Sequence, residues 1–206
     1  MIVEWIGFDD EIERPAITEA VESRYKNCIE VLFPYFGLNY RPREVRRINL
    51  AFGSIEEGEY LQDAITIKSP TFGLFLGALN QNITPISSYV VHETCHHLHH
   101  LSNPSFCKKP RKFIPSSEKL SRNLHLFELV PEYAECLYWD VVGKGEEYIA
   151  YLKTENSEYR QSGMRLYQYA RNFLPNLAKI DEHKETFHPF LDSVHRLAVK
   201  EAEVLV

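Results

Sequence analysis

The sequence predicts an α+β fold, in which a small N-terminal β-sheet is followed by a mainly helical C-terminal part. Up to Pro85, short apolar runs are bounded by Gly, Pro and Asn, which is typical of strands and turns. Beyond Pro85, apolar residues recur at helical spacing over most of the chain. A length of 206 residues suits one domain with a sizeable core. We therefore expect a single domain over 1–206, with the sheet in 1–84, a pair of helices in 85–143 and a helical tail in 144–206.

The N-terminal part is expected to hold three or four strands and one helix. The helix is predicted over residues 16–33, where it follows Pro15, a good first helical residue, and ends before Pro34. The strands are predicted from alternation or from short apolar runs, over residues 2–8, 45–52, 64–68 and 71–79.

The C-terminal part is expected to consist of helices joined by short breaks. The first helix covers residues 89–101, with Ser87 or Ser88 as its cap and the Asn103-Pro104 pair as its stop. Later helices are predicted from Ser121 or Asn123 to Gly143, and over residues 146–158, 164–174 and 181–206.

The charge and hydropathy of the chain argue against nucleic-acid and membrane partners. The formal net charge is −6, whereas phosphate binding needs a basic face. A basic stretch from Lys108 to Arg122 opposes this average, and Pro110 and Pro115 mark it as an irregular, solvated loop. No apolar run approaches the roughly 18 to 20 residues that a membrane helix needs.

The N-terminus and the cysteines predict a cytoplasmic protein. Met1 is followed by Ile-Val-Glu-Trp rather than by the basic segment and apolar core of a secretory signal. The cysteines form neither a C-x-x-C pair nor a zinc-finger spacing. We expect reduced and mostly buried thiols at Cys28, Cys95, Cys107 and Cys136.

The stretch His92-Glu93-Thr94-Cys95-His96 is an H-E-x-x-H motif within a predicted helix. Residues four apart lie on one face of a helix, so His92 and His96 can present imidazole nitrogens to one metal ion. Glu93 can then reach a water molecule held by that ion. Zinc lowers the pKa of such a water to about 7, and a nearby carboxylate can take its proton and pass it to a leaving amine.

A catalytic zinc site needs a third protein ligand, since three ligands leave one position open. The nearby His97, His99 and His100 are interpreted as neighbours of the site, because His100 lies about 6 Å beyond His96 along the helix axis. A later predicted helix carries three acidic residues in one sector of its helical wheel, and these are the candidates: Glu128, Glu132 and Glu135.

An H-E-x-x-H motif followed by a glutamate on a later helix resembles the gluzincin branch of the zinc metallopeptidases, the thermolysin-like and aminopeptidase-like enzymes. In that branch the third ligand commonly lies in an Asn-Glu-Gly-x-Ala-Glu context, which residues 129–135 resemble, with Pro131 in place of the Asn. The resemblance implies a zincin-like fold, a zinc cofactor, the ligands His92, His96 and Glu132, and Glu93 as the general base.

Two alternatives to Glu132 stay open. Glu128 is the first, because Glu128 with Glu132 four residues later resembles the ligand and the supporting acid of the gluzincin branch. Glu135, which is followed by the small Cys136, is the second.

A second resemblance is to small metal-dependent hydrolases that take a third histidine from later in the chain. The motif is followed by Asn103-Pro-Ser-Phe106, and Phe106 falls where those proteins have a Phe. However, Ser102 stands six residues after His96, where those proteins and the metzincins have the third histidine. This difference favours a glutamate as the third ligand.

The gluzincin resemblance predicts a zinc-dependent peptidase that acts on a peptide or protein substrate. An extended peptide would add to the edge of the sheet, for which the stretch from Thr71 to Asn80 is the candidate. The alternatives are a metal-binding regulatory or structural protein on a peptidase-like scaffold, and an interaction domain without a metal. The donor to a developing oxyanion is open among Tyr133, Tyr138, His183, His188 and His195.

Overall fold

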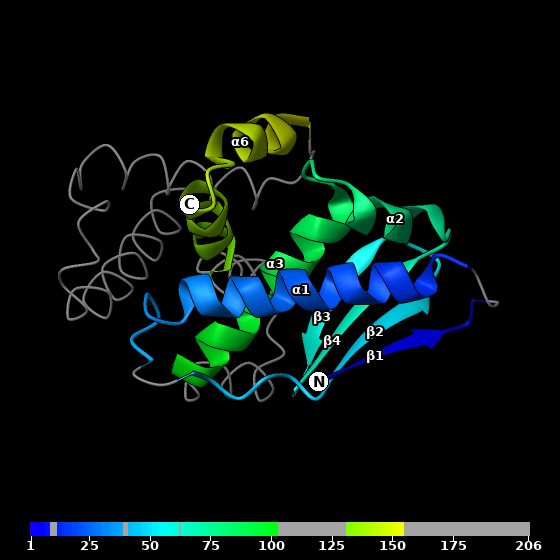
Figure 1. Ribbon diagram of the computed structural model, residues 1–206, viewed down its shortest axis with the longest axis horizontal. Helices are drawn as coiled ribbons and strands as arrows, with labels where there is room; N and C mark the ends of the chain where they lie inside the picture. Colours follow the sequence, from blue (N-terminus) through cyan, green and yellow to red (C-terminus); the bar gives the residue numbers. More distant parts are fainter. Residues whose placement is uncertain (9–11, 39–40, 62, 103–130, 155–206) are drawn as a thin grey trace, which may run out of the picture.

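The computed structural model describes residues 1–8, 12–38, 41–61, 63–102 and 131–154. These residues form a small sheet with helices packed against it and beside it (Figure 1). The predicted α+β class is confirmed in this described part of the chain.

Four strands form one mixed sheet in the order β1-β2-β4-β3. β1 (Ile2–Ile6), β2 (Arg47–Phe52) and β4 (Ala64–Ser69) run parallel, whereas β3 (Glu57–Leu61) pairs antiparallel with β4. Only two residues separate Leu61 from Ala64, so β3 and β4 form a hairpin. β3 is therefore an edge strand of the sheet, at the opposite edge from β1.

Two long helices, α1 (Arg14–Leu32) and α3 (Pro85–Ser102), cover one face of the sheet (Figure 1). They pack on each other, and α3 lies along β3. The residues that the central strands point at the helices alternate along each strand, as in a half-buried sheet. They are fully buried and comprise Ile48, Leu50, Ile65 and Ile67.

A second apolar core lies on another side of α3, where the helix of residues 131–141 and α6 (Gly145–Thr154) pack. Val91 and Leu98 of α3 belong to this second core, whereas Ile86 and Val90 belong to the core under the sheet. α3 is thus enclosed by two cores, and this packing holds its polar side chains in defined positions.

Three of the four cysteines lie in the second core. Cys28, Cys95 and Cys136 are free, buried thiols, as expected, and Cys107 lies outside the described residues. Burial raises the pKa of the Cys95 thiol well above its usual value. Cys95 packs among apolar side chains of the second core and fills space inside the motif.

Most predicted elements are confirmed. The helices predicted over 16–33 and 89–101 are α1 and α3, and the strands predicted over 2–8, 45–52 and 64–68 are β1, β2 and β4. The helix predicted to end at Gly143 is helical over 131–141, and the next one is α6. The helices predicted over 164–174 and 181–206 lie outside the described residues.

The strand predicted over residues 71–79 is wrong. This stretch forms the short helices α2 (Gly73–Leu76) and η1 (Gly77–Leu79), in which neighbouring residues Leu74 and Phe75 are buried together. The stretch from Thr71 to Asn80 is therefore not the edge of the sheet. The edge beside α3 is β3, which the sequence analysis missed because Glu57-Gly-Glu contains residue types that are depleted in strands.

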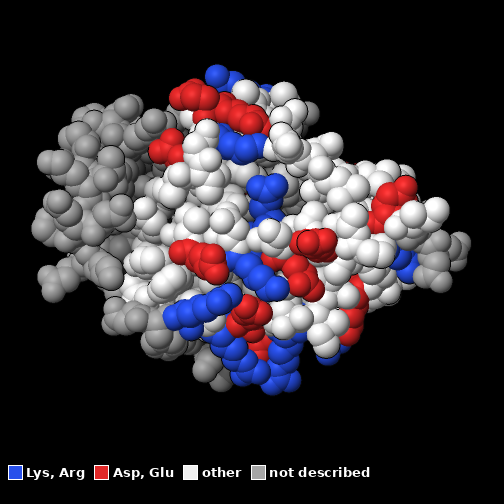
Figure 2. Space-filling model, viewed as in Figure 1, with Lys and Arg blue, Asp and Glu red and all other residues white. Residues whose placement is uncertain are grey.

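On the surface of the molecule where α1 lies, charged side chains of both signs are mixed (Figure 2). Lys26 lies 3.2 Å from Glu22 on α1, and Arg41 lies 3.2 Å from Glu44. The basic stretch from Lys108 to Arg122 lies outside the described residues. None of the described helices combines the length and the hydropathy of a membrane-spanning segment.

Candidate metal centre

α3 begins at Pro85, so Thr84 stands at its N-cap position and the predicted caps Ser87 and Ser88 lie inside the helix; Ser87 bonds back to Thr84. The Thr84 N–H donates to Ser87 Oγ at 2.8 Å, and the Ser87 hydroxyl donates to the Thr84 carbonyl at 2.8 Å. Ser88, the alternative cap, instead points into the second core and is fully buried. Because Ser88 and His92 are four residues apart, they share one face of the helix.

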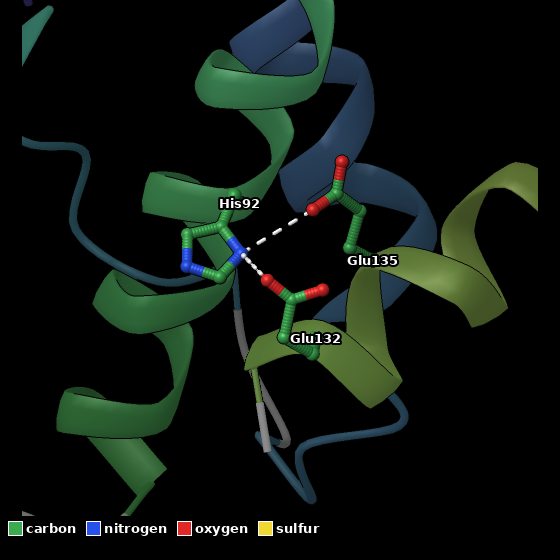
Figure 3. A group of neighbouring side chains, drawn as sticks. All are labelled: His92, Glu132 and Glu135. Carbon is green, nitrogen blue, oxygen red and sulfur yellow. Dashed lines mark hydrogen bonds and ion pairs between the residues drawn. The ribbon is translucent and has the colours of Figure 1, made fainter. Parts of the chain in front are cut away.

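His92 presents its two ring nitrogens to different partners. Its Nδ1 lies 3.3 Å from Glu132 Oε1 and 3.3 Å from Glu135 Oε2, and both carboxylates point at this atom (Figure 3). Its Nε2 lies 3.1 Å from His96 Nε2. An ionised carboxylate only accepts hydrogen bonds, so Nδ1 carries the proton of the neutral ring. The lone pair of His92 is therefore on Nε2 and faces His96.

The spacing of the two Nε2 atoms fits a shared metal ion. Zinc binds imidazole nitrogens at about 2.0–2.1 Å in tetrahedral geometry, which places two such nitrogens about 3.3 Å apart. The observed 3.1 Å between His92 and His96 is close to this value. His92 is buried and His96 is half-buried, so the pair lies at the boundary between the interior and solvent.

Glu135 is held in place by two further hydrogen bonds. The Ser88 hydroxyl donates to Glu135 Oε1 at 2.6 Å, and the Trp139 Nε1–H donates to the same oxygen at 3.3 Å. These bonds leave Oε2 to accept from His92 Nδ1. A carboxylate in this position fixes the tautomer and the orientation of an imidazole and raises its basicity at the other nitrogen.

Glu132 and Glu135 are both fully buried, one helical turn apart. Two carboxylates this close repel each other and lose hydration, and a cation beside them offsets both costs. One ligand atom each from His92, Glu132 and Glu135 lie within 4.8 Å of one another, so these residues could hold a metal. The described residues thus offer two places for an ion, one on the Nε2 pair and one on His92 Nδ1.

Glu93 lies where α3 meets the edge strand and is only 4% exposed. An ideal Cβ on Gly58 of β3 would lie 2.7 Å from Glu93 Oε1, so the carboxylate rests against the backbone of the strand. Glu132 and Glu135 approach from the helix of residues 131–141 instead. Buried acidic side chains therefore lie on two sides of α3, Glu93 toward β3 and the other two toward the helix of residues 131–141.

His97, the histidine next to His96, has a structural environment. Its Nε2 lies 2.7 Å from the Arg43 carbonyl and its Nδ1 lies 3.1 Å from the Tyr60 hydroxyl. A carbonyl only accepts, so Nε2 carries the proton and Nδ1 accepts from Tyr60. Burial lowers the pKa of His97, so the neutral ring is the stable form. His97 ties β3 and the segment before β2 to α3, as expected of a neighbour of the site.

The register of the β3–β4 hairpin shows which backbone groups of β3 point outward. Leu61 and Ala64 close a hairpin with two residues between them, so they form a hydrogen-bonded pair. Such pairs alternate along an antiparallel ladder, and the next ones are at Glu59 and Glu57. The N–H and C=O groups of Gly58 and Tyr60 therefore face the outer edge of the sheet.

The structure brings the predicted ligands together only in part. His92 and His96 converge through Nε2, and Glu132 reaches His92 through Nδ1. Glu128 lies outside the described residues, and the assignment of Glu132 as the third ligand stays a prediction. Sequence reasoning missed the bonds to Glu135, although helical spacing was a signal: Ser88 precedes His92 by four residues and Trp139 follows Glu135 by four.

The donor to an oxyanion also stays open. Tyr138 donates to Asn27 Oδ1 on α1 at 2.7 Å, and burial raises its pKa to about 12. Tyr133 is fully buried in the second core, where burial likewise raises its pKa. The other candidates, His183, His188 and His195, lie outside the described residues.

Comparisons of the chain with models of protein families, with curated proteins and with solved structures found no match in any of the three. The chemistry of this site must therefore be inferred from its own geometry.

Proposed function

We propose that the protein is a zinc-dependent peptidase, in which His92, His96 and Glu132 hold the ion and Glu93 is the general base. The observation that supports this most directly is the 3.1 Å approach of the two histidine Nε2 atoms on α3. Two imidazoles and a carboxylate are a ligand set that suits zinc. The three described cysteines are free thiols, which suits work in the cytoplasm.

The two carboxylates at His92 Nδ1 are given different roles. A neutral imidazole has a single N–H, so only one carboxylate can accept from it at a time. The bonds from Ser88 and Trp139 hold Glu135 in that position. We therefore assign Glu135 the role of orienting His92 and keep Glu132 as the third ligand, with Glu128 as the alternative. Glu132 Oε1 lies at Nδ1 in the structure, so this role requires its side chain to swing to the Nε2 side of the ring.

The proposed mechanism depends on proton transfer by Glu93. When bound, zinc supplies a Lewis acid that polarises the scissile carbonyl and acidifies a water molecule. Glu93 accepts the proton of the attacking water on a carboxylate oxygen and delivers it to the nitrogen of the leaving amine. Packing against β3 restricts the orientation of the Glu93 carboxylate and shields it from bulk water.

The substrate is an extended peptide that pairs with the outer edge of β3. The outward N–H and C=O groups of Gly58 and Tyr60 offer the hydrogen bonds of β-strand addition. Gly58 contacts Glu93, so a peptide paired there passes the base. This edge replaces the stretch from Thr71 to Asn80, which is helical.

The test measures zinc and hydrolysis in the same preparation. Protein purified without added metal is expected to contain about one zinc ion per chain by elemental analysis and to cleave a peptide library. Glu93→Gln should retain the zinc and lose about 10²- to 10⁴-fold in kcat, which is the usual contribution of a general base. A verified activity that survived Glu93→Gln would show that Glu93 is not the base.

One observation favours a second candidate, a metal-binding regulatory or structural protein. His92, Glu132 and Glu135 can close around an ion on the Nδ1 side, away from Glu93. Zinc bound without hydrolysis, together with loss of zinc in Glu135→Gln and its retention in His96→Ala, would support this reading. Retention of zinc in Glu135→Gln and loss in His96→Ala would support the catalytic site.

A further inference from the structure

Gly58 is a glycine because of what lies opposite it. A Cβ at this position would lie 2.7 Å from Glu93 Oε1, 3.1 Å from Glu93 Cγ and 3.2 Å from Tyr89 Cδ1. Its backbone φ lies outside the left-handed region, so no unusual conformation requires glycine. The close approach of α3 to β3 at Glu93 is therefore the physical reason for this residue.

The same residue turns its backbone groups to the outer edge of β3, where no other described strand pairs. The ladder register turns the N–H and C=O of Gly58 outward, where a peptide would pair. Its missing side chain would point toward α3, where the Glu93 carboxylate lies. Gly58 thus contacts the general base on one side and the substrate position on the other.

We propose that Gly58 is a positioning residue, whose lack of a side chain lets the strand that holds the substrate also set the location of the Glu93 carboxylate. This inference rests on the proposed peptidase function. A methyl group at position 58 would push the carboxylate away by about 1 Å, because carbon and oxygen atoms in contact need roughly 3.5 Å. A displacement of this size at a reacting group costs about 100-fold in rate.

The first measurement is the kinetics of Gly58→Ala. We expect kcat to fall about 100-fold while KM and zinc content stay unchanged, because the added methyl group faces Glu93 and not the outer edge. In the Glu93→Asp background, where the carboxylate is shorter, Gly58→Ala should cost much less. The matched control is Gly145→Ala at the start of α6, because a Cβ on Gly145 would likewise lie close to a carboxylate, 2.5 Å from Asp140 Oδ1. This control should lose no kcat.

The second measurement needs neither zinc nor activity. In metal-free protein, Gly58→Ala should lower the urea midpoint of unfolding, and in the Glu93→Ala background it should lower the midpoint far less. An equal lowering in both backgrounds would overturn the proposal, as would unchanged kcat in Gly58→Ala of an active enzyme. Absence of hydrolysis in the wild type would instead overturn the proposed function itself, while the midpoints would still report the contact.

Discussion

Two of the three buried histidines of α3, His92 and His97, have different surroundings. His92 lies on the side of the helix of residues 131–141, where its Nδ1 meets two carboxylates and its Nε2 meets a second imidazole. His97 lies on the side of β3, where a carbonyl and a tyrosine hydroxyl occupy its two nitrogens. Both rings are at most 5% exposed, so burial alone does not separate them.

The difference between these two sides shows how partners assign a role to a buried histidine. The neutral partners of His97 satisfy both of its nitrogens, so the ring has no lone pair left for a metal. The carboxylates at His92 satisfy one nitrogen and increase the electron density at the other. His92 is therefore suited to a cation, whereas His97 is suited to holding three segments together.

The largest expected effect is the contrast between His92→Ala and His97→Ala. His92→Ala should abolish stoichiometric zinc binding, because one of the two converging nitrogens is lost. His97→Ala should keep the zinc but lower the free energy of unfolding by about 2–4 kcal/mol, since it leaves a cavity and removes the bonds of two partly buried polar groups. Elemental analysis and urea unfolding measure the two quantities. Loss of zinc in His97→Ala with a folded chain would break the distinction.

The next effect distinguishes the two carboxylates at His92. If Glu132 is the third ligand, Glu132→Gln should remove zinc binding, whereas Glu135→Gln should weaken it about 10- to 100-fold as an orienting partner does. Competition with a zinc chelator measures the affinities. A loss of only about 10- to 100-fold in Glu132→Gln as well would assign both residues to orientation and move the third ligand to Glu128.

The sequence predicts one side of this comparison better than the other. Four-residue spacing is local, so the convergence of His92 and His96 could be predicted from the motif and is found. The partners of His92 Nδ1 come from about 40 residues later, and they depend on how two helices pack. The sequence pattern therefore limits the candidates for the third metal ligand to three glutamates. It does not predict that Glu132 and Glu135 both contact His92 Nδ1.

The edge strand shows the same limit. Glu57–Leu61 has weak strand propensity of its own and is a strand because it pairs with β4 and packs on α3. Residues 71–79 have a more apolar sequence but form short helices. The role of Gly58 could not be predicted either, because it depends on the distance to Glu93, a residue 35 positions later.

A smaller effect separates the adjacent serines of α3. Ser88→Ala removes a donor to Glu135, so it should lower both the free energy of unfolding, by about 1–2 kcal/mol, and the zinc affinity. Ser87→Ala removes the hydrogen bonds between Ser87 and Thr84 at the start of α3 and should cost about 1 kcal/mol with no change in zinc affinity. Chelator competition on both variants is the measurement. Equal zinc affinities would show that the Ser88 bond does not reach the metal site.

The smallest effect concerns the His97 side. Tyr60→Phe removes the hydroxyl that donates to His97 Nδ1 and should lower the free energy of unfolding by about 1 kcal/mol, with zinc affinity unchanged. Residues that share a bond couple, so Tyr60→Phe should cost almost nothing further in the His97→Ala background. Urea unfolding of the two single variants and the double variant measures this coupling. Additive costs would mean that the Tyr60 hydroxyl is stabilised by another group, and His97 would then hold the strand through its ring contacts alone.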